Sequence, residues 1–344
     1  MSISVQQIEF DYPRDLVAQH PCDPRDHSRL LALRRCSGNV EHRRFDDLPD
    51  LLNCGDILVL NDTKVMRARL EGRREPTGGK VKLLLLRRLS GLVWDVLIEP
   101  PRRRRVGAVF SFGDGSLKAQ VVEVNPDHSF SVEFNCKAED VESAIDEVGI
   151  VPLPPYIKGK LSDESQYQTV FATQSGSVAA PTAGLHFTSR LLGQLNEMGV
   201  KCAVVTLHVG WATFRPIATT TLSEHKMYRE WCTVSDETAR LVGAAVKQGH
   251  RVVAVGTTTV RTIESAVRAN GCLQSWSGWT DLFIQPPYDF QVVDALITNF
   301  HLPRSTNLVM ASAFAGNEAL MNAYAMAIAE RYRLFSFGDA MFIS

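Results

Sequence analysis

Histidine is the side chain in this sequence best suited to acid–base chemistry, because its ordinary pKa lies near neutral pH. Four histidines, His186, His208, His225 and His301, lie in or near unusual polar clusters. None of the four has the i, i+4 or cysteine-paired spacing of a metal-ligand set. They therefore favour proton transfer or hydrogen bonding, and we predict no metal site.

Three stretches that read as buried strands run directly into polar clusters. The clusters are residues 208–215 (HVGWATFR), 256–261 (GTTTVR) and 298–303 (TNFHLP). Any one of them alone is more typical of a loop that caps a strand. In open α/β sheets, however, ligands bind beside the carboxyl ends of the strands. We therefore expect the three clusters together to converge on one crevice.

The turn at residues 256–261 has the features of an anion-binding helix start. Gly256 permits close backbone approach, while the threonine hydroxyls and the free N–H groups of the next helix face a ligand. Such a site suits a carboxylate or a phosphate. The turn is neither Gly-x-Gly-x-x-Gly nor a Walker loop, so a dinucleotide or a nucleoside triphosphate is a weak hypothesis.

Residues 176–188 form the most unusual segment of the chain. Its small residues and Pro181 predict a tight, preorganised loop with exposed N–H groups. His186 adds a titratable group, Phe187 adds a ring that can stack, and Thr188 can cap the helix that follows. By composition alone, this segment is a candidate binding loop.

A strongly basic segment lies within a chain of 344 residues whose formal net charge is only −1. Residues 64–105 contain thirteen basic and four acidic residues, a net charge of +9, so the rest of the chain carries −10. The local field decides binding within a Debye length, so this segment can attract phosphates. The alternative is an ordinary solvated strand surface. The candidate phosphate contacts, by their position in the segment, are Arg67, Arg69, Arg73, Arg102, Arg103, Arg104 and Arg105.

Short runs of Val, Phe and Leu, punctuated by Gly, Pro, Asp and Asn, predict a small antiparallel barrel or sandwich. The expected strands are 81–86, 93–98, 109–112, 117–124 and 130–134, followed by a helix at 138–148. The rest of the chain alternates strands (56–61, 202–209, 251–255, 292–298, 335–343) with helices (189–198, 237–247, 262–269, 318–332), which favours parallel βα units. We therefore predict a mixed α/β domain, residues 1–63 and 151–344, into which residues 64–150 are inserted as an antiparallel β domain.

The sequence also bears on location. There is no apolar run of about 20 residues that could cross a bilayer, and the first ten residues have no basic start typical of a signal peptide. The seven cysteines are scattered, as in proteins of a reducing compartment. We expect a cytoplasmic protein that makes no use of a membrane.

Long segments of the chain resemble the S-adenosylmethionine:tRNA ribosyltransferase-isomerase family. They are residues 176–188 (GSVAAPTAGLHFT), 206–216 (TLHVGWATFRP), 254–265 (AVGTTTVRTIES) and 293–303 (VDALITNFHLP). Shorter matches include 151–156 (VPLPPY), 312–316 (SAFAG) and 335–341 (FSFGDAM), so the resemblance runs nearly end to end.

The resemblance implies an α/β catalytic domain carrying an inserted antiparallel β-barrel. It implies transfer and isomerisation of the ribosyl part of S-adenosylmethionine onto the 7-aminomethyl-7-deazaguanine wobble base of tRNAs with a GUN anticodon. The products are epoxyqueuosine in tRNA, adenine and methionine. S-adenosylmethionine is then a substrate, no metal or other cofactor is expected, and we expect a monomer.

On this substrate, the position of each residue within the clusters suggests its role. His186, His208 and His301 are the acid–base candidates, with Glu230 a weaker one. Thr257, Thr258 and Arg261 are candidates for holding the methionine carboxylate or the ribose, and Phe187 and Phe214 for stacking on a base. The remaining candidates for substrate binding are Pro181, Thr182, Ala183, Gly184, Leu185, Gly210, Thr213, Arg215, Gly256, Glu264 and Asn299.

The sequence departs from the family pattern at Ala212, Tyr228 and Pro287, where the family usually has Gly, His and Gly, and at Gln166, where it often has Arg. Tyr228 titrates near pH 10 and cannot replace a neutral-pH base. These departures leave open a tRNA-binding paralogue without turnover. A methyltransferase using S-adenosylmethionine is a third hypothesis, against which the absence of a glycine-rich loop after a first strand argues.

Overall fold

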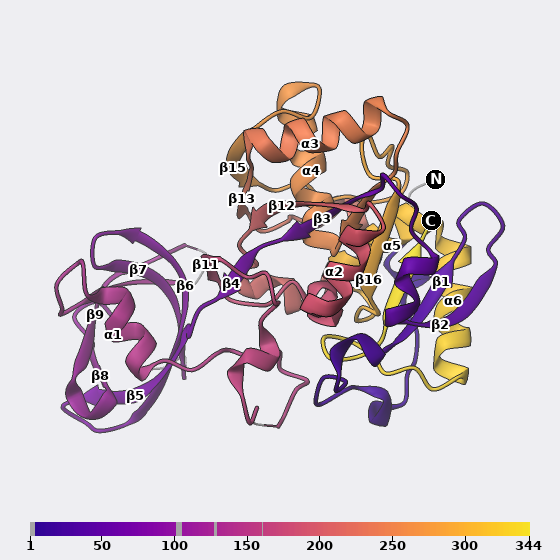
Figure 1. The fold of residues 1–344 in the computed structure, drawn as a ribbon. Coiled ribbons are helices and arrows are strands. Elements are labelled where there is room, and N and C mark those ends of the chain that lie inside the picture. Colours follow the sequence, from indigo (N-terminus) through magenta and orange to yellow (C-terminus); the bar gives the residue numbers. More distant parts are fainter. Residues whose placement is uncertain (1–3, 101–104, 127–128, 160) are drawn as a thin grey trace. The chain divides into compact units, whose positions relative to one another are not determined.

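The computed structural model describes residues 4–100, 105–126, 129–159 and 161–344 (Figure 1). The chain folds as two compact units. The first comprises Met1–Lys64, Pro154–Gln174 and Ala180–Ser344, and the second comprises Val65–Leu153 and Ser175–Ala179. The second unit is therefore an insertion in the first, and the short segment 175–179 also belongs to the second unit.

A nine-stranded sheet is the centre of the first unit, in the order β15-β13-β12-β3-β14-β16-β17-β1-β2. The four central strands β12, β3, β14 and β16 are parallel neighbours, so their carboxyl ends lie along one edge of the sheet. The strands are β1 (Arg29–Leu33), β2 (Val40–Arg44), β3 (Ile57–Asn61), β12 (Lys201–Leu207), β13 (Glu230–Val234), β14 (Val252–Val255), β15 (Trp276–Thr280), β16 (Ala295–Asn299) and β17 (Ala340–Ile343).

Both faces of the central strands are buried, which explains why β3 and β14 are apolar at nearly every position rather than alternating. Ile57 and Val59 of β3 join a core cluster with residues of α3, α4, α5 and α6, whereas Leu58 and Leu60 join a second cluster with residues of α2. The helices are α2 (Ser189–Glu197), α3 (Asp236–Lys247), α4 (Thr257–Asn270), α5 (Thr306–Ala315) and α6 (Asn317–Ala329). The unit therefore has a helix–sheet–helix architecture.

The second unit is a closed barrel of six antiparallel strands in the order β10-β7-β6-β5-β8-β9. Its strands are β5 (Arg69–Glu75), β6 (Lys80–Ser90), β7 (Val93–Glu99), β8 (Val109–Phe112), β9 (Leu117–Val124) and β10 (Phe130–Phe134). Phe110, Phe112 and Phe134 are among the buried side chains that fill it, and helix α1 (Val141–Val148) adds Val141 and Ile145. Closure pairs every strand on both sides, so no edge strand is left. Strands β4 (Thr63–Val65) and β11 (Gln174–Ser177) form a separate two-stranded sheet.

The predicted class, mixed α/β with an inserted antiparallel β-barrel, is confirmed. Several boundaries differ from the prediction, and three of the differences have a clear cause or consequence. Helix α4 begins at Thr257 instead of residue 262, because Gly256 adopts φ 89° and lets the helix start directly after β14. The strand predicted at 335–343 is only Ala340–Ile343, since Phe335 has φ 70° and begins a turn. The last helix ends at Ala329, three residues early.

The α-helices and strands that the sequence did not predict are β1, β2, β4, β5, β11, β13, β15 and α5. Helix α5 is apolar on all sides and buried along most of its length, so it lacks the amphipathic period that identifies a surface helix. Within the described residues, none of the helices combines the length and the apolar character needed to span a bilayer.

Candidate functional site

Asn61, the last residue of β3, joins three of the strand ends. Its side-chain Nδ2 donates to the Leu207 carbonyl and to Thr258 Oγ1, both at 3.1 Å, and its Oδ1 accepts from the Leu207 N–H at 3.0 Å. Because Leu207 ends β12 and Thr258 lies in the first turn of α4, one buried amide ties together β3, β12 and the turn after β14.

The loop before α2 joins the remaining strand end. Thr182 Oγ1 donates to Asn299 Oδ1 at 2.9 Å, at the end of β16. At Gly256, a side-chain Cβ would lie 3.7 Å from Ala183 Cβ and 3.5 Å from Thr258 Oγ1, so the loop packs on the start of α4. The predicted convergence of these segments is therefore what the structure shows.

His186 is the centre of a buried hydrogen-bond network. Its Nδ1 lies 2.7 Å from Ser28 Oγ and its Nε2 lies 3.1 Å from Asn299 Nδ2, while its ring stacks on Phe45 at 4.9 Å. Burial lowers its pKa to about 3. An amide donor on Nε2 assigns the proton to Nδ1. This neutral ring has both nitrogens engaged, so in this structure it holds the loop in place.

Phe187 belongs to the core. Its ring is fully buried and lies 5.0 Å from Phe45 and 6.4 Å from Phe171. The expectation that Phe187 stacks on a base is therefore corrected, because no face of the ring is open to a ligand. The side chain of Phe214, the other stacking candidate, lies outside the described part of the structure.

His208, just beyond β12, is half-buried. Its Nδ1 lies 2.8 Å from Thr63 Oγ1, and among the described residues no group bonds its Nε2. Burial lowers its pKa, and the charge of Asp62 opposes that shift. Asp62 is itself held by Thr206 Oγ1 at 2.6 Å and Thr173 Oγ1 at 2.8 Å. His208 thus keeps one ring nitrogen for proton exchange.

His301 lies just beyond β16. Its Nε2 is 2.7 Å from Thr298 Oγ1, and its backbone N–H donates to the Tyr324 hydroxyl at 2.8 Å. Burial lowers the pKa of this ring as well. These contacts fix the end of β16 against α6. Unlike His186, His301 keeps one ring nitrogen, Nδ1, without a partner among the described residues.

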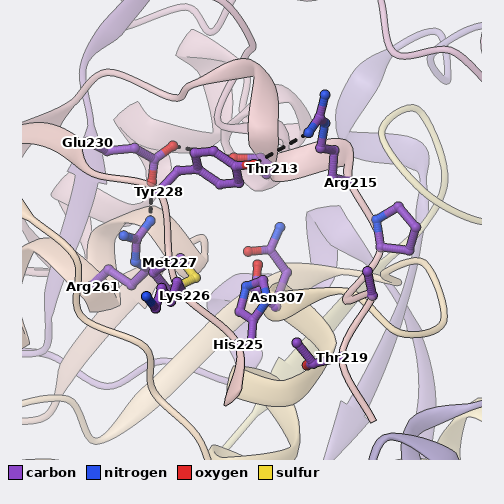
Figure 2. Close-up of a pocket in the computed structure, with 13 residues that line it drawn as sticks. Thr213, Arg215, Thr219, His225, Lys226, Met227, Tyr228, Glu230, Arg261 and Asn307 are labelled. Carbon is purple, nitrogen blue, oxygen red and sulfur yellow. Dashed lines mark hydrogen bonds and ion pairs between the residues drawn. The ribbon is translucent and has the colours of Figure 1, made fainter. Parts of the chain in front are cut away.

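Glu230 and Arg261 form a buried ion pair (Figure 2). Glu230 also accepts from the Gly210 N–H at 2.7 Å and from Thr213 Oγ1 at 3.3 Å, and Arg261 Nε donates to the Leu282 carbonyl at 3.2 Å. Both oxygens of Glu230 are occupied, which leaves it poorly suited to abstract a proton. Its evident role is to hold the 208–215 loop on α4.

Glu264, one turn further along α4, binds another loop. Its carboxylate accepts from the backbone N–H groups of Gln291 and Val292 at 3.2–3.3 Å and from the Tyr288 hydroxyl at 3.3 Å. Burial raises its pKa, and these hydrogen bonds oppose that shift. Glu264 therefore anchors the 288–292 segment, and it is not part of the surface open to a ligand.

A cavity of about 210 Å³ opens beside the Glu230–Arg261 pair, and we call it the Tyr228 cavity (Figure 2). It contains the predicted residues Thr213 and Arg215. It also has wall residues that the sequence analysis did not assign to a site, namely Pro216, Ala218, Thr219, Lys226, Met227, Thr306 and Asn307. Thr257 Oγ1 donates to Asn307 Oδ1 at 3.2 Å, which connects the cavity with the start of α4. The Ser305-Thr306-Asn307 cap of the unrecognised helix α5 was the missed signal.

The predicted tRNA-contacting arginines lie in the barrel unit. Arg73 and Arg105 are exposed, whereas Arg67 and Arg69 are partly buried and Arg67 donates to the Asp146 carbonyl at 2.8 Å. Arg102, Arg103 and Arg104 lie outside the described residues. Of the residues that are described, no three His, Cys, Asp or Glu side chains are grouped so that they could hold a metal ion.

Removing one partner of the buried ion pair should destabilise the first unit strongly. We expect Arg261→Met to lower the free energy of unfolding by about 3–5 kcal/mol, because Glu230 is left charged and buried. The double variant Arg261→Met/Glu230→Gln should recover part of this loss. Arg268→Met, which breaks an exposed pair with Asp281, is the control and should cost at most about 1 kcal/mol. Urea unfolding measures all three, and a double variant no more stable than Arg261→Met would contradict the assignment.

Acid should destabilise the fold through His186. Its pKa of about 3 in the folded chain lies below the unfolded value near 6.5, so only the unfolded chain takes up this proton between those limits. The stability that depends on neutral His186 is fully present above pH 6.5 and falls as pH drops, by at most about 1.4 kcal/mol per unit. NMR of the ring checks this directly, and a ring that titrates near pH 6.5 in the folded protein would disprove it.

Comparison with known proteins agrees with this geometry. The family model described as queuosine biosynthesis protein matches residues 5–343. The S-adenosylmethionine:tRNA ribosyltransferase-isomerases of Moorella thermoacetica and Acetivibrio thermocellus are 50% and 49% identical over 98% and 99% of this chain, and over 99% and 100% of their own lengths.

A solved structure is also similar. The crystal structure of S-adenosylmethionine tRNA ribosyltransferase from Thermotoga maritima matches with a TM-score of 0.58 and 37% identity, covering 98% of this chain and 100% of that one. The match of a family model to almost every residue, together with relatives at half identity over their full lengths, shows that the chain belongs to the queuosine biosynthesis protein family.

Proposed function

We propose that this chain is an S-adenosylmethionine:tRNA ribosyltransferase-isomerase. It transfers and isomerises the ribosyl part of S-adenosylmethionine onto the aminomethyl group of 7-aminomethyl-7-deazaguanine, the wobble base of tRNAs with a GUN anticodon. The products are epoxyqueuosine in tRNA, adenine and methionine. The observation that carries the proposal is the convergence of four separate polar segments, joined through Asn61, Thr182 and Gly256, at one edge of the sheet.

The reaction needs a base, an acid and a site that excludes water. The sulfonium acidifies the neighbouring C5′ hydrogens, so removal of one proton gives an ylide. Adenine leaves with a proton on a ring nitrogen, and the neutral amine of the tRNA base bonds to the sugar carbon that adenine left. The C1′–O4′ bond of the sugar then opens to an iminium at C1′ and an alkoxide at O4′, and the ylide carbon C5′ bonds to C1′ to close the carbocycle. The O4′ alkoxide attacks C5′, and the C–S bond breaks to release methionine and leave the epoxide.

Among the proposed acid–base residues, His208 fits best. Both His208 and His301 keep one ring nitrogen free of described partners, but burial lowers the pKa of His301 to about 3, whereas the charge of Asp62 opposes the shift at His208. Burial holds His208 neutral at pH 7, as a base requires. His186 and His301 would act by positioning the loop and the end of β16. Thr257, Thr258 and the N–H groups that begin α4 are the proposed contacts to polar groups of S-adenosylmethionine.

S-adenosylmethionine is the only small substrate in this proposal, with no metal and no further cofactor. We place the enzyme in the cytoplasm, as a monomer. The departures Ala212, Tyr228 and Pro287 remain the basis of the competing hypothesis, a tRNA-binding relative without turnover, and product formation separates the two.

The direct test supplies S-adenosylmethionine and tRNA that carries the aminomethyl-deazaguanine wobble base. Wild-type protein should release adenine and methionine in equal amounts and form epoxyqueuosine, whereas tRNA with an unmodified guanine should give neither. We expect His208→Gln to lower kcat about 100- to 10,000-fold, since proton transfer loses its base. Val246→Ala on the exposed side of α3 is the control. Full activity of His208→Gln would remove this histidine from the mechanism, and no product from the wild type would favour the inactive relative.

The barrel arginines should supply a salt-dependent part of tRNA binding. Reversing the exposed Arg73 and Arg105 to Glu should weaken tRNA affinity and make its dependence on salt less steep, by about one unit of slope for each phosphate that the variant no longer binds. Arg240→Glu, an equal charge change per residue on exposed α3, is the control. An unchanged slope in the double variant would exclude these two arginines from the RNA interface.

A further inference from the structure

Two side chains that line the Tyr228 cavity, Arg215 and Tyr228, are exposed and contact the partly exposed Trp211 ring. The guanidinium carbon of Arg215 lies 3.8 Å from the centre of the Trp211 ring, and Tyr228 lies 5.8 Å from Trp211 with the ring planes at 54°. Arg215 also donates to the Tyr228 hydroxyl at 3.4 Å (Figure 2). Tyr228 is 45% exposed although it lines a cavity. Aromatic rings and arginine planes held in this way are the surfaces on which unpaired nucleobases stack.

The charge of the cavity favours an anion. Its lining contains Arg215, Lys226 and Arg261 against a single carboxylate, Glu230, so its formal net charge is +2. The Glu230 charge is already neutralised by Arg261. Across the part of the chain that the structure describes, neither Arg215 nor Lys226 has a carboxylate within ion-pair distance. Two cations thus remain for a ligand.

This charge discriminates between the two substrates of the proposed reaction. S-adenosylmethionine carries a sulfonium, an ammonium and a carboxylate, a net charge of +1, so a cavity of the same sign disfavours it. Each nucleotide of RNA instead carries one negative phosphate next to a base that can stack. The cavity also adjoins the start of α4 through the Thr257–Asn307 hydrogen bond, so a nucleotide held there would lie close to the strand ends.

We propose that the Tyr228 cavity receives one nucleotide of the RNA substrate, whose base stacks on the Tyr228 ring and whose phosphate lies beside Arg215 and Lys226. S-adenosylmethionine binds instead at the strand ends. This inference rests on the proposed function, because it assumes that RNA is the substrate. It assigns a role to Tyr228, a departure from the family pattern, and to Trp211 and Lys226, which have no part in the acid–base chemistry.

The test measures binding of an RNA stem-loop with a GUN anticodon, in parallel with binding of S-adenosylmethionine. Tyr228→Ala should weaken RNA binding roughly 5- to 150-fold, which is the range for loss of one base–aromatic stack. Tyr228→Phe keeps the ring and should retain most of the affinity. Lys226→Gln should weaken binding and lower the salt slope by about one. None of these variants should change the affinity for S-adenosylmethionine.

Trp279→Ala is the matched control, since Trp279 is an exposed tryptophan on β15 that does not line the cavity. Circular dichroism of each variant separates loss of binding from loss of folding. RNA affinity that stays unchanged in Tyr228→Ala and Lys226→Gln would overturn the inference, as would a selective loss of S-adenosylmethionine binding. If the variants overturn the inference in this way but the wild type turns over, the cavity assignment alone is refuted. If the wild type binds the RNA but does not turn over, the proposed activity alone is refuted.

Discussion

The arrangement of this protein depends on one constraint, the parallel direction of four adjacent strands. Because β12, β3, β14 and β16 run the same way, every segment that follows one of them begins at the same edge of the sheet. Asn61 then joins β3 to β12 and α4 with its single side-chain amide. Polar residues that are up to two hundred positions apart in the chain thereby share one site.

Burial divides the polar residues of this edge into two groups. His186, His301, Glu230 and Glu264 have polar atoms taken up by protein partners, and they hold loops and strand ends in fixed positions. A buried polar group without a partner would be costly, so these hydrogen bonds also keep the first unit in one conformation. His208 and His301 are each bonded at only one ring nitrogen, but burial lowers the pKa of His301 to about 3, whereas the charge of Asp62 opposes the shift at His208. Proton transfer needs a histidine that has an unbonded ring nitrogen and is held in a fixed position by its surroundings.

Charge distinguishes the regions that we propose for the two substrates. The strand ends offer neutral hydroxyl and amide groups together with the N–H groups of a helix start, which suit a small ligand of mixed charge. The Tyr228 cavity offers two uncompensated cations and stacked rings, and the barrel unit carries exposed arginines. Basic side chains attract phosphates over about a Debye length. The basic surface that binds RNA can therefore cover a wider area than the site where the reaction takes place.

The sequence by itself determined the fold class and identified the candidate segments for the chemistry. Buried strands such as residues 57–61 and 252–255 are recognisable from continuous apolar runs, and the polar clusters that follow them are equally visible. It could not find α5, because an evenly apolar helix has no period, and so it missed the Asn307 side of the cavity.

The tertiary structure alone decided what each candidate side chain does. Phe187 and His208 read alike as exposed members of polar motifs, yet one is a core ring and the other a half-buried histidine with a free nitrogen. The physical reason is that exposure, hydrogen-bond partners and pKa are set by neighbours from distant parts of the chain. Ser28 and Asn299 contact His186, and Arg261 contacts Glu230. Neither set of contacts can be inferred from the residues next to His186 or Glu230 in the sequence.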